Sequence, residues 1–389
     1  MNIKKEARRF FSKIDWFILL LCTGLVILGT VLLLGISQAH YARLLKIGSL
    51  NSQIIAAVLG IVSALIIANI DYRAIANKWK IYVPLSYMFL FATFLFGVAT
   101  PERPDAKRWF IIPGINMSVQ PSEFLKLAFI LSFAYHAHKT QEKFNHPLNI
   151  LLLCVHAVIP VALVQYQGDS GTALMFALIF LTMIFMAGLK WVYLLAAAVS
   201  IPTAIPIVWN FVLSNMQKRR ILSLIGRSEA DALGDYYQQS RAALAITSGG
   251  RTGNGLFYDA HTYVPEIHND FIFAFIGDAL GIIGCLAVTA VILMINVKIL
   301  INCAAAQDKQ GQIICAGVFA MIFFQSIVNI AMCLSLLPVI GNSLPFVSSG
   351  GSSVLANYLG IGLVLSVYKH TNRRRVVENF LPNKGGYLQ

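Results

Sequence analysis

The sequence predicts an all-α polytopic membrane protein with about ten transmembrane helices and a long extracytoplasmic loop between spans seven and eight. Of the 389 residues, 57% are hydrophobic and only 12% are charged, whereas an average soluble domain carries roughly a quarter charged residues. A water-soluble fold of this composition could not cover its surface with polar groups, so a bilayer must be its main solvent. The apolar runs are also too long for barrel strands, which alternate polar and apolar residues over about ten positions.

Ten apolar runs mark the predicted spans. Crossing the hydrocarbon core as a helix takes about 20 mostly apolar residues. The runs are Trp16–Ser37, Ser52–Ile70, Ile81–Ala99, Ser122–Tyr135, Leu148–Val164, Thr172–Gly188, Trp191–Leu213, Phe271–Ile295, Ile313–Leu336 and Ser352–Tyr368. No small-residue cleavage site follows the first run, which favours a retained helix over a signal peptide. We therefore expect one membrane domain over residues 1–389.

The distribution of Lys and Arg predicts that both termini face the cytoplasm. The side that holds the termini carries eighteen of these residues, and the short segments of the opposite side carry five. The loop at about 214–269 is discounted, because long loops translocate largely regardless of charge. The net charge of +13 is then mainly a topology signal, and we expect no nucleic-acid partner.

The loop at about 214–269 is long enough to be functional or disordered. Basic residues mixed with Ile and Leu over Lys218–Arg227 predict a helix lying along the membrane surface. A second helix is predicted over Tyr237–Thr247, where a Gly-Gly pair follows. The glycine-rich segment around Arg251 can present N–H groups to phosphate, although it lacks the P-loop spacing.

Charged side chains inside or at the edges of the predicted spans are costly in a bilayer and indicate function by default. The acids are Glu123, Asp169, Asp270 and Asp278, and the matching cation is Lys126. All of them lie toward the predicted outer face. We therefore expect the chemistry on that side of the membrane.

Glu123 and Lys126 are three residues apart on one helix face, which is close enough to pair. An acid in the first turn after Pro121 is also ordinary helix-start chemistry, and this explains Glu123 about equally well. Lys126 does not fit that explanation, because it lies a turn inside an apolar helix.

Asp270 lies where the long loop enters an apolar run, and a partly desolvated carboxylate at this boundary is a candidate general base. Asp278 follows two turns later on the same helix face and requires a buried partner. Asp169, at the start of a span, is interpreted first as a helix cap. Ser352 lies in a Ser- and Gly-rich entry to the last run, where helix packing and contact with a sugar or lipid are both open.

Several blocks of residues together resemble the SEDS family, the shape, elongation, division and sporulation proteins that include RodA, FtsW and SpoVE. The resemblance extends in order over nearly the whole chain. The blocks are Lys107-Arg108-Trp109, Gln120-Pro121-Ser122-Glu123 with Lys126, Pro265-Glu266 with Asp270-Phe271-Ile272-Phe273-Ala274, and Leu344-Pro345-Phe346 with Gly350-Gly351-Ser352. Departures from the family pattern leave the subfamily open. They include Asn269, Asp278, Ala279 and Ser349.

The resemblance implies a membrane-embedded peptidoglycan glycosyltransferase that polymerises lipid II, the lipid-linked disaccharide precursor. It implies work in the bacterial cytoplasmic membrane, among membrane lipids, with a class B penicillin-binding protein that supplies cross-linking. It implies that Asp270 corresponds to the catalytic acid of the family, and that Arg108, Glu123 and Lys126 correspond to its important charged positions. Elongation, division and sporulation remain open as its role.

For such a reaction we expect Asp270 to take the proton from the acceptor hydroxyl in one inverting displacement. The departing polyprenyl diphosphate needs charge stabilisation more than a proton, and Arg108, Lys126 and Arg251 would supply it. Glu123 would orient Lys126 or, together with Asp270, hold a divalent cation such as Mg²⁺ or Mn²⁺. No organic cofactor is expected. Three further residues would support the site: Asp169, Asp278 and Ser352.

Two alternatives belong to other functional classes. A flippase for the lipid-linked precursor would need polar residues through the midplane of the membrane, whereas the charges here gather at the outer face. A non-catalytic scaffold for a penicillin-binding protein would not need Asp270 together with its basic neighbours.

Overall fold

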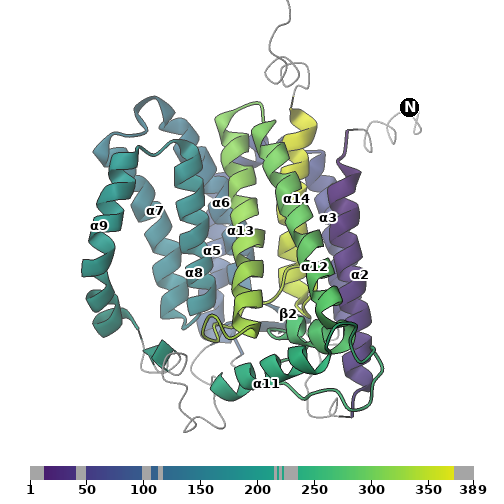
Figure 1. The fold of residues 1–389 in the computed structure, drawn as a ribbon. Helices are drawn as coiled ribbons and strands as arrows, with labels where there is room; N and C mark the ends of the chain where they lie inside the picture. The colour runs from purple at the N-terminus through teal and green to yellow at the C-terminus, as the bar shows by residue number, and fades with distance from the viewer. Residues whose placement is uncertain are drawn as a thin grey trace, which may run out of the picture.

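Long helices form a bundle in the computed structural model of the protein (Figure 1). The structure describes residues 13–40, 50–98, 107–112, 117–213, 217–218, 221–222 and 235–371. Within these ranges the long helices are α2 (Trp16–Gln38), α3 (Leu50–Ala68), α5 (Trp79–Phe96), α6 (Pro121–Lys139), α7 (Pro147–Tyr166), α8 (Ser170–Ala187), α9 (Trp191–Ile207), α12 (Ile272–Ala304), α13 (Lys309–Cys333) and α14 (Gly351–His370). Each of them overlaps one of the predicted spans.

Eight of these helices are long and apolar enough to cross a membrane, as far as the described residues go. The chain is therefore a polytopic helical membrane protein. The two long helices outside this group are α6, which contains Glu123 and Lys126, and α9, which has 17 residues. Ten spans remain a prediction, because α6 is less apolar than the other long helices and α9 is shorter than them.

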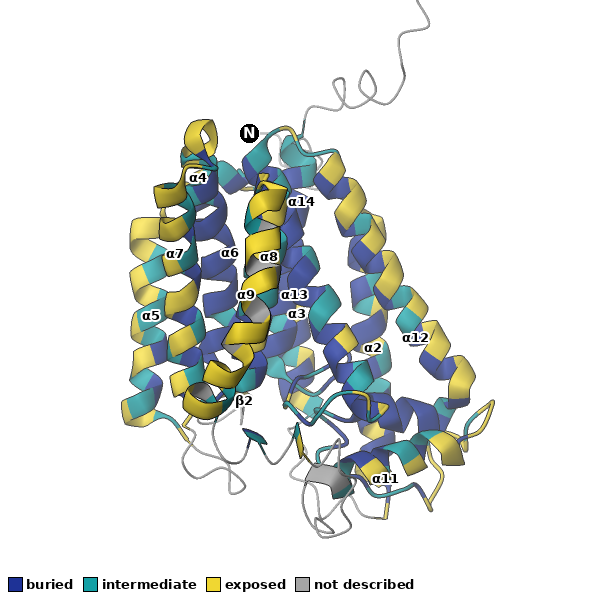
Figure 2. Cartoon of the chain, turned by 60° about the vertical axis from the view of Figure 1, so that its left-hand side comes forward, coloured by how far each residue is buried: buried dark blue, intermediate teal, exposed yellow. Residues whose placement is uncertain are grey.

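The core of the bundle is built around α13 and α14. In the most apolar stretch of each helix, 72% of α13 and 78% of α14 is buried, against 11% of α5. Figure 2 shows the contrast with α9, which is exposed over most of its surface. An apolar helix that is buried on all sides lies inside a bundle, whereas exposed apolar helices face lipid.

Glycines let α3 and α14 approach closely. A methyl group added to Gly60 would lie 2.6 Å from Cδ2 of Tyr358, and one added to Gly362 would lie 2.9 Å from Cα of Ala64. Small residues at such crossings allow helix backbones to come together in a membrane, where packing replaces the hydrophobic effect between helices.

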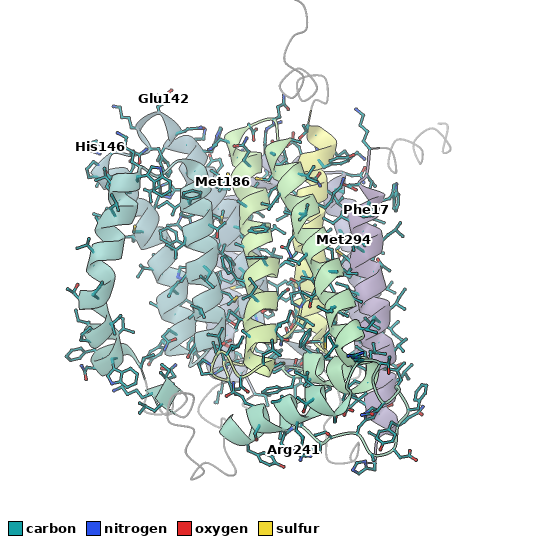
Figure 3. All side chains as sticks on the ribbon, in the orientation of Figure 1. Phe17, Glu142, His146, Met186, Arg241 and Met294 are labelled. Atoms are coloured by element: carbon teal, nitrogen blue, oxygen red, sulfur yellow. The ribbon has the colours of Figure 1, made fainter. Side chains whose placement is uncertain are left out.

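Shorter elements gather at the end of the bundle that holds Asp270, called here the Asp270 end. An antiparallel hairpin joins β1 (Phe110–Ile112) to β2 (Met117–Val119). Figure 3 places Arg241 of α11 (Asp235–Ser248) at this end, opposite Glu142 and His146.

The predicted helix at Tyr237–Thr247 is confirmed as α11, which is slightly longer. Most of the predicted surface helix at Lys218–Arg227 lies outside the described residues. Five of the six cysteines are buried and Cys154 is half-buried, and all six are free thiols.

A kink divides α12 at Gly281, whose φ of 67° and ψ of −168° interrupt the helix. The positive φ favours glycine, and a methyl group there would lie 2.5 Å from the Arg251 carbonyl carbon. The loop before α12 bonds to this kink, because Ile282 N donates to the Gly250 carbonyl at 3.0 Å and Asn254 N donates to the Asp278 carbonyl at 2.9 Å. The loop and the start of α12 thus fold as one unit.

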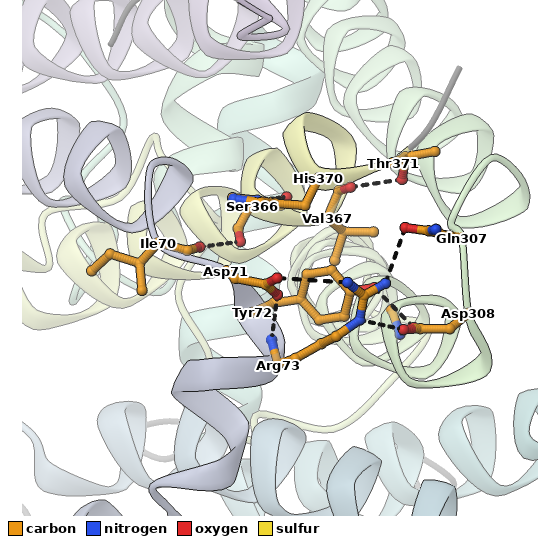
Figure 4. A network of polar contacts seen from close by, with 11 residues as sticks. Ile70, Asp71, Tyr72, Arg73, Gln307, Asp308, Ser366, Val367, His370 and Thr371 are labelled. Carbon is orange, nitrogen blue, oxygen red and sulfur yellow. Dashed lines mark hydrogen bonds and ion pairs between the residues drawn. The ribbon is translucent and has the colours of Figure 1, made fainter. Parts of the chain in front are cut away.

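At the opposite end, a polar cluster joins the short helix α4 (Tyr72–Asn77) to the start of α13 (Figure 4). Asp308 caps α13 by accepting from Gly311 N at 2.8 Å. Its carboxylate also accepts from the Tyr72 hydroxyl at 2.9 Å and from Arg73 Nε at 2.5 Å. Arg73 in turn donates to Gln307 at 3.2 Å. Tyr72, Arg73, Gln307 and Asp308 thus form one hydrogen-bonded cluster.

Candidate active site

Asp270 lies half-buried in the turn that precedes α12. Three successive carbonyl groups of this turn accept hydrogen bonds from elsewhere in the chain. The His268 carbonyl accepts from Ser349 N at 3.0 Å, and the Asn269 carbonyl from Ser348 Oγ at 2.7 Å. The Asp270 carbonyl accepts from Asn329 Nδ2 at 2.8 Å. The backbone that carries the carboxylate is therefore held on both sides.

The Asp270 carboxylate faces the main chain of Gly341. A methyl group added to Gly341 would lie 3.5 Å from Asp270 Oδ2, and the φ of Gly341 is 74°. Glycine suits this position, because it adopts the left-handed region readily and adds no side chain beside the carboxylate.

The same segment reaches the start of α8. A methyl group added to Gly171 would lie 2.8 Å from the Ile340 carbonyl oxygen and 3.3 Å from that of Gly341. Gly171 therefore lets the 340–341 segment pack directly on α8. Through this contact Asp270 is linked to the neighbourhood of Asp169, two residues before Gly171.

Asp169 is 2% exposed and does more than cap α8. Its carboxylate accepts the capping bond from Thr172 N at 3.2 Å and a second bond from the Thr172 hydroxyl at 3.0 Å. It also accepts from Gln120 Nε2 at 2.6 Å and pairs with Arg108 at 3.6 Å. The predicted cap is confirmed, and Asp169 in addition joins Arg108 and the start of α6 to α8.

Arg108 keeps one donor unused. Its Nη1 pairs with Asp169, and its Nη2 donates to the Gly168 carbonyl. Its buried Nε has no hydrogen-bond partner among the residues that the structure describes. A guanidinium with a spare N–H is suited to an oxyanion ligand.

Glu123 and Lys126 form the predicted pair, with 2.9 Å between Lys126 Nζ and Glu123 Oε1. Both are almost fully buried, with 1% of the Lys126 side chain and 7% of the Glu123 side chain exposed. The second carboxylate oxygen, Oε2, has no hydrogen-bond partner in the described part of the chain. A buried pair with unsatisfied polar atoms is costly, so it is weak evidence for stability and favours a functional role.

The required partner of Asp278 is in the loop before α12. The buried carboxylate accepts from Asn254 Nδ2 at 2.7 Å and from Thr262 N at 3.0 Å. His261 Nδ1 lies 3.2 Å away and is also buried. Asp278 therefore fixes the loop that leads into the Asp270 turn.

Arg251 and Ser352 have different positions. The Arg251 carbonyl accepts from Ile283 N at 3.3 Å at the kink of α12, while the residue itself is exposed. Ser352 is fully buried at the start of α14, and its hydroxyl has no hydrogen-bond partner within the described ranges.

Glu266 and His268 lie close to Asp270 in the loop before α12. Burial raises the pKa of Glu266 above its ordinary value, and burial lowers the pKa of His268 to about 4. His268 is therefore neutral at pH 7 and adds no positive charge beside Asp270.

No three His, Cys, Asp or Glu side chains in the described ranges come together as a metal site. Glu123 is already paired with Lys126. The protein residues described here therefore do not form a metal centre on their own, and the predicted cation remains a prediction.

Sequence reasoning missed the buried amides of α13. Gln325 donates to the Ser343 carbonyl at 3.1 Å, and Asn329 donates to the carbonyls of Asp270 and Asn342. The signal was present, because Gln325 and Asn329 are polar residues four apart within an apolar run. Their partners lie in distant loops, so the sequence did not reveal what they hold.

Comparisons with known proteins find relatives that match nearly the whole chain. The peptidoglycan glycosyltransferase MrdB of Escherichia coli K12 is 30% identical over 379 residues, covering 95% of this chain and 98% of that protein. A protein of Geobacter sulfurreducens named probable peptidoglycan glycosyltransferase FtsW is 32% identical over 374 residues, covering 94% and 97%.

A solved structure described as structural coordination of polymerization and crosslinking by a peptidoglycan synthase complex contains a chain with the same fold. The TM-score is 0.76 at 22% identity, covering 93% of this chain and all of that one. The model of the FtsW, RodA and SpoVE family, described as cell cycle proteins, matches residues 14–373. With nearly the whole sequence matched and its motif residues arranged around one end of the bundle, this chain belongs to the FtsW, RodA and SpoVE family.

Proposed function

We propose that this protein is a peptidoglycan glycosyltransferase that polymerises lipid II into glycan strands at the outer face of the bacterial cytoplasmic membrane. The observation that carries the proposal is the Asp270 turn, in which three successive carbonyls are hydrogen-bonded and the carboxylate faces Gly341. Family membership and relatives named as peptidoglycan glycosyltransferases support the same reaction.

In this reaction Asp270 acts as the general base. Its carboxylate takes the proton of the acceptor hydroxyl as the oxygen attacks the anomeric carbon of the donor sugar. The bond from that carbon to the diphosphate breaks in the same displacement, and the configuration inverts. One carboxylate is enough because the leaving diphosphate needs no proton, unlike the leaving group in most glycoside hydrolysis.

Arg108 and Lys126 stabilise the departing diphosphate. The unpaired Nε of Arg108 is available to a phosphate oxygen, and Asp169 fixes the direction of the guanidinium. Lys126 has three N–H donors and Glu123 orients its ammonium group. Fixed donors aimed at developing charge are worth more in a water-poor site than in bulk water. The exposed Arg251 attracts the anionic substrate toward the site.

The proposed topology has ten spans, with both termini in the cytoplasm. The excess of Lys and Arg on the terminal side supports it. The N-terminal end of α2 and the C-terminal end of α14 also lie at the same end of the bundle (Figure 1). The Asp270 end then faces outward. We propose a class B penicillin-binding protein as the partner that cross-links the new strands, and the fold match to a chain of a peptidoglycan synthase complex supports it.

A divalent cation, Mg²⁺ or Mn²⁺, is proposed to enter with the substrate. Mg²⁺ is commonly bound through substrate phosphates and one or two carboxylates, without a complete protein cage. The Oε2 of Glu123, which has no hydrogen-bond partner among the described residues, is available as such a metal ligand.

Polymerisation of lipid II by purified protein tests the proposal. Asp270→Asn should abolish glycan synthesis, while Asp259→Asn, an exposed acid in the same loop, should leave it unchanged. Both variants must be inserted and folded as the unmodified protein is. Glycan synthesis retained by Asp270→Asn would rule out the base assignment. Failure of the unmodified protein to polymerise would favour a scaffold or a flippase.

A further inference from the structure

One face of α13 is directed at the Asp270 turn and the segment beside it. Gln325, Asn329 and Cys333 follow one another at intervals of four residues, so they share this face. Gln325 donates to the Ser343 carbonyl at 3.1 Å, and Cys333 Sγ lies 3.8 Å from the Asp270 carbonyl oxygen. Asn329 lies between them and is fully buried.

Asn329 holds two chain segments with one amide group. Its Nδ2 donates to the Asp270 carbonyl at 2.8 Å and to the Asn342 carbonyl at 2.6 Å. Asn342 follows Gly341, whose main chain faces the Asp270 carboxylate. The amide therefore fixes the backbone that carries the carboxylate and, at the same time, the segment that the carboxylate faces.

These contacts depend on amide chemistry. A primary amide has two N–H donors, and two carbonyl acceptors use both. A carboxylate of the same size would place an acceptor against two carbonyls. An apolar side chain would remove the amide donor from both buried carbonyls and leave the Asp270 carbonyl with the weak thiol donor of Cys333.

A comparison within the molecule shows that a buried Asn in a span is not always used in this way. Asn296, on the neighbouring helix α12, is 2% exposed, and its Nδ2 donates to the Ile292 carbonyl of its own helix at 2.9 Å. Among the residues that the structure describes, the amide of Asn296 therefore joins no second segment, whereas that of Asn329 joins two.

We propose that Asn329 is a positioning residue for Asp270, which sets the distance between the carboxylate and the acceptor hydroxyl. The inference rests on the proposed function, in which Asp270 is the base. Asn329 does not touch the reacting atoms. Its removal lets the Asp270 turn and the 340–342 segment move apart, and a displacement of about 1 Å at a reacting group can reduce a rate about 100-fold.

The test measures lipid II polymerisation by purified Asn329→Ala, Asn329→Asp and Asn296→Ala. We expect both Asn329 variants to lower kcat by about 10- to 100-fold while KM for lipid II changes less than about threefold. Asn329→Asp keeps the size of the side chain, so its loss of activity reports on the donors and not on a cavity. Asn296→Ala measures the general effect of removing a buried amide and should retain nearly full kcat.

Thermal unfolding separates positioning from folding. The Asn329 variants should unfold within the range set by Asn296→Ala, although their kcat falls much further. The proposal is wrong if Asn329→Ala and Asn296→Ala have equal kcat, or if the loss in both Asn329 variants equals the loss of folded protein. An inactive Asp270→Asn beside a fully active Asn329→Ala would defeat the positioning role alone. An active Asp270→Asn would instead defeat the assignment of the base.

Discussion

Replacing Gly171 by Ala should disturb the Asp270 site from the side of α8. The added methyl group would lie 2.8 Å from the Ile340 carbonyl oxygen, whereas ordinary van der Waals contact begins at 3.4 Å. The 340–341 segment must therefore retreat by about 0.6 Å, and it is this segment that faces the Asp270 carboxylate. Overpacking of this kind destabilises a protein by about 1 to 3 kcal/mol.

The effect on catalysis follows from the same displacement. A shift of about 1 Å at a reacting group can reduce a rate about 100-fold, so a shift of about 0.6 Å should reduce polymerisation about tenfold. The rate is measured with purified protein and lipid II, and stability by thermal unfolding in the same detergent.

Gly24→Ala is the matched control. Gly24 lies in α2, and a methyl group there meets nothing within 4 Å. Without a clash the substitution should be neutral or stabilise by up to about 1 kcal/mol, through helix propensity alone. If Gly171→Ala were as active and as stable as Gly24→Ala, the 340–341 segment would not constrain the Asp270 site.

Three further predictions concern charge. Arg108→Ala should lower kcat about 100-fold or more, because it removes a donor to the diphosphate. Arg108→Lys should restore only part of the lost kcat, because the bonds to Asp169 and Gly168 need the forked guanidinium. Steady-state rates of both variants check this. Chelation with EDTA should stop polymerisation, and added Mg²⁺ or Mn²⁺ should restore it; full activity in EDTA would exclude the cation. Burial raises the pKa of Asp308, but the hydrogen bonds from Gly311 N, Arg73 and Tyr72 lower it further, so the pKa lies below its ordinary 3.8. The ionised carboxylate therefore stabilises the fold above pH 3.8, and this stabilisation is lost as the pH falls through the lowered pKa. The thermal stability gap between the unmodified protein and Asp308→Asn should therefore be about 1 kcal/mol or more at neutral pH and should close below pH 3.8; a gap that does not change with pH would contradict the assignment.

The spans could be predicted because a bilayer imposes one simple requirement, a long apolar helix, and that requirement is visible in local sequence. The structure has a helix at each predicted run, including the run with Glu123 and Lys126, where hydropathy was weakest. The kink at Gly281 was not predicted, since one glycine in an apolar run also fits an uninterrupted helix. The β1–β2 hairpin was missed because three-residue strands are too short to show a pattern.

The charged residues of the site could be predicted from the sequence, whereas the residues that hold them in place could not. Asp270 and Lys126 are visible because charge is rare in apolar runs. The groups that hold Asp270 in place are uncharged and come from Asn329, Gly341 and Ser348, which are 59 or more residues away in the chain. Such contacts depend on how the helices and loops pack, and no local sequence pattern reports on them.

The close fit of α14 against α3 has a consequence for how the protein is made. Helix α3 can pack against α14, its main neighbour, only after α14 (Gly351–His370) has left the ribosome and entered the membrane. Until then the surface around Gly60 and Ala64 must be covered by lipid or by another protein. Chains that stop before residue 351 would therefore insert in the membrane without the helix that completes the core of the bundle. We expect them to be targets of membrane quality control.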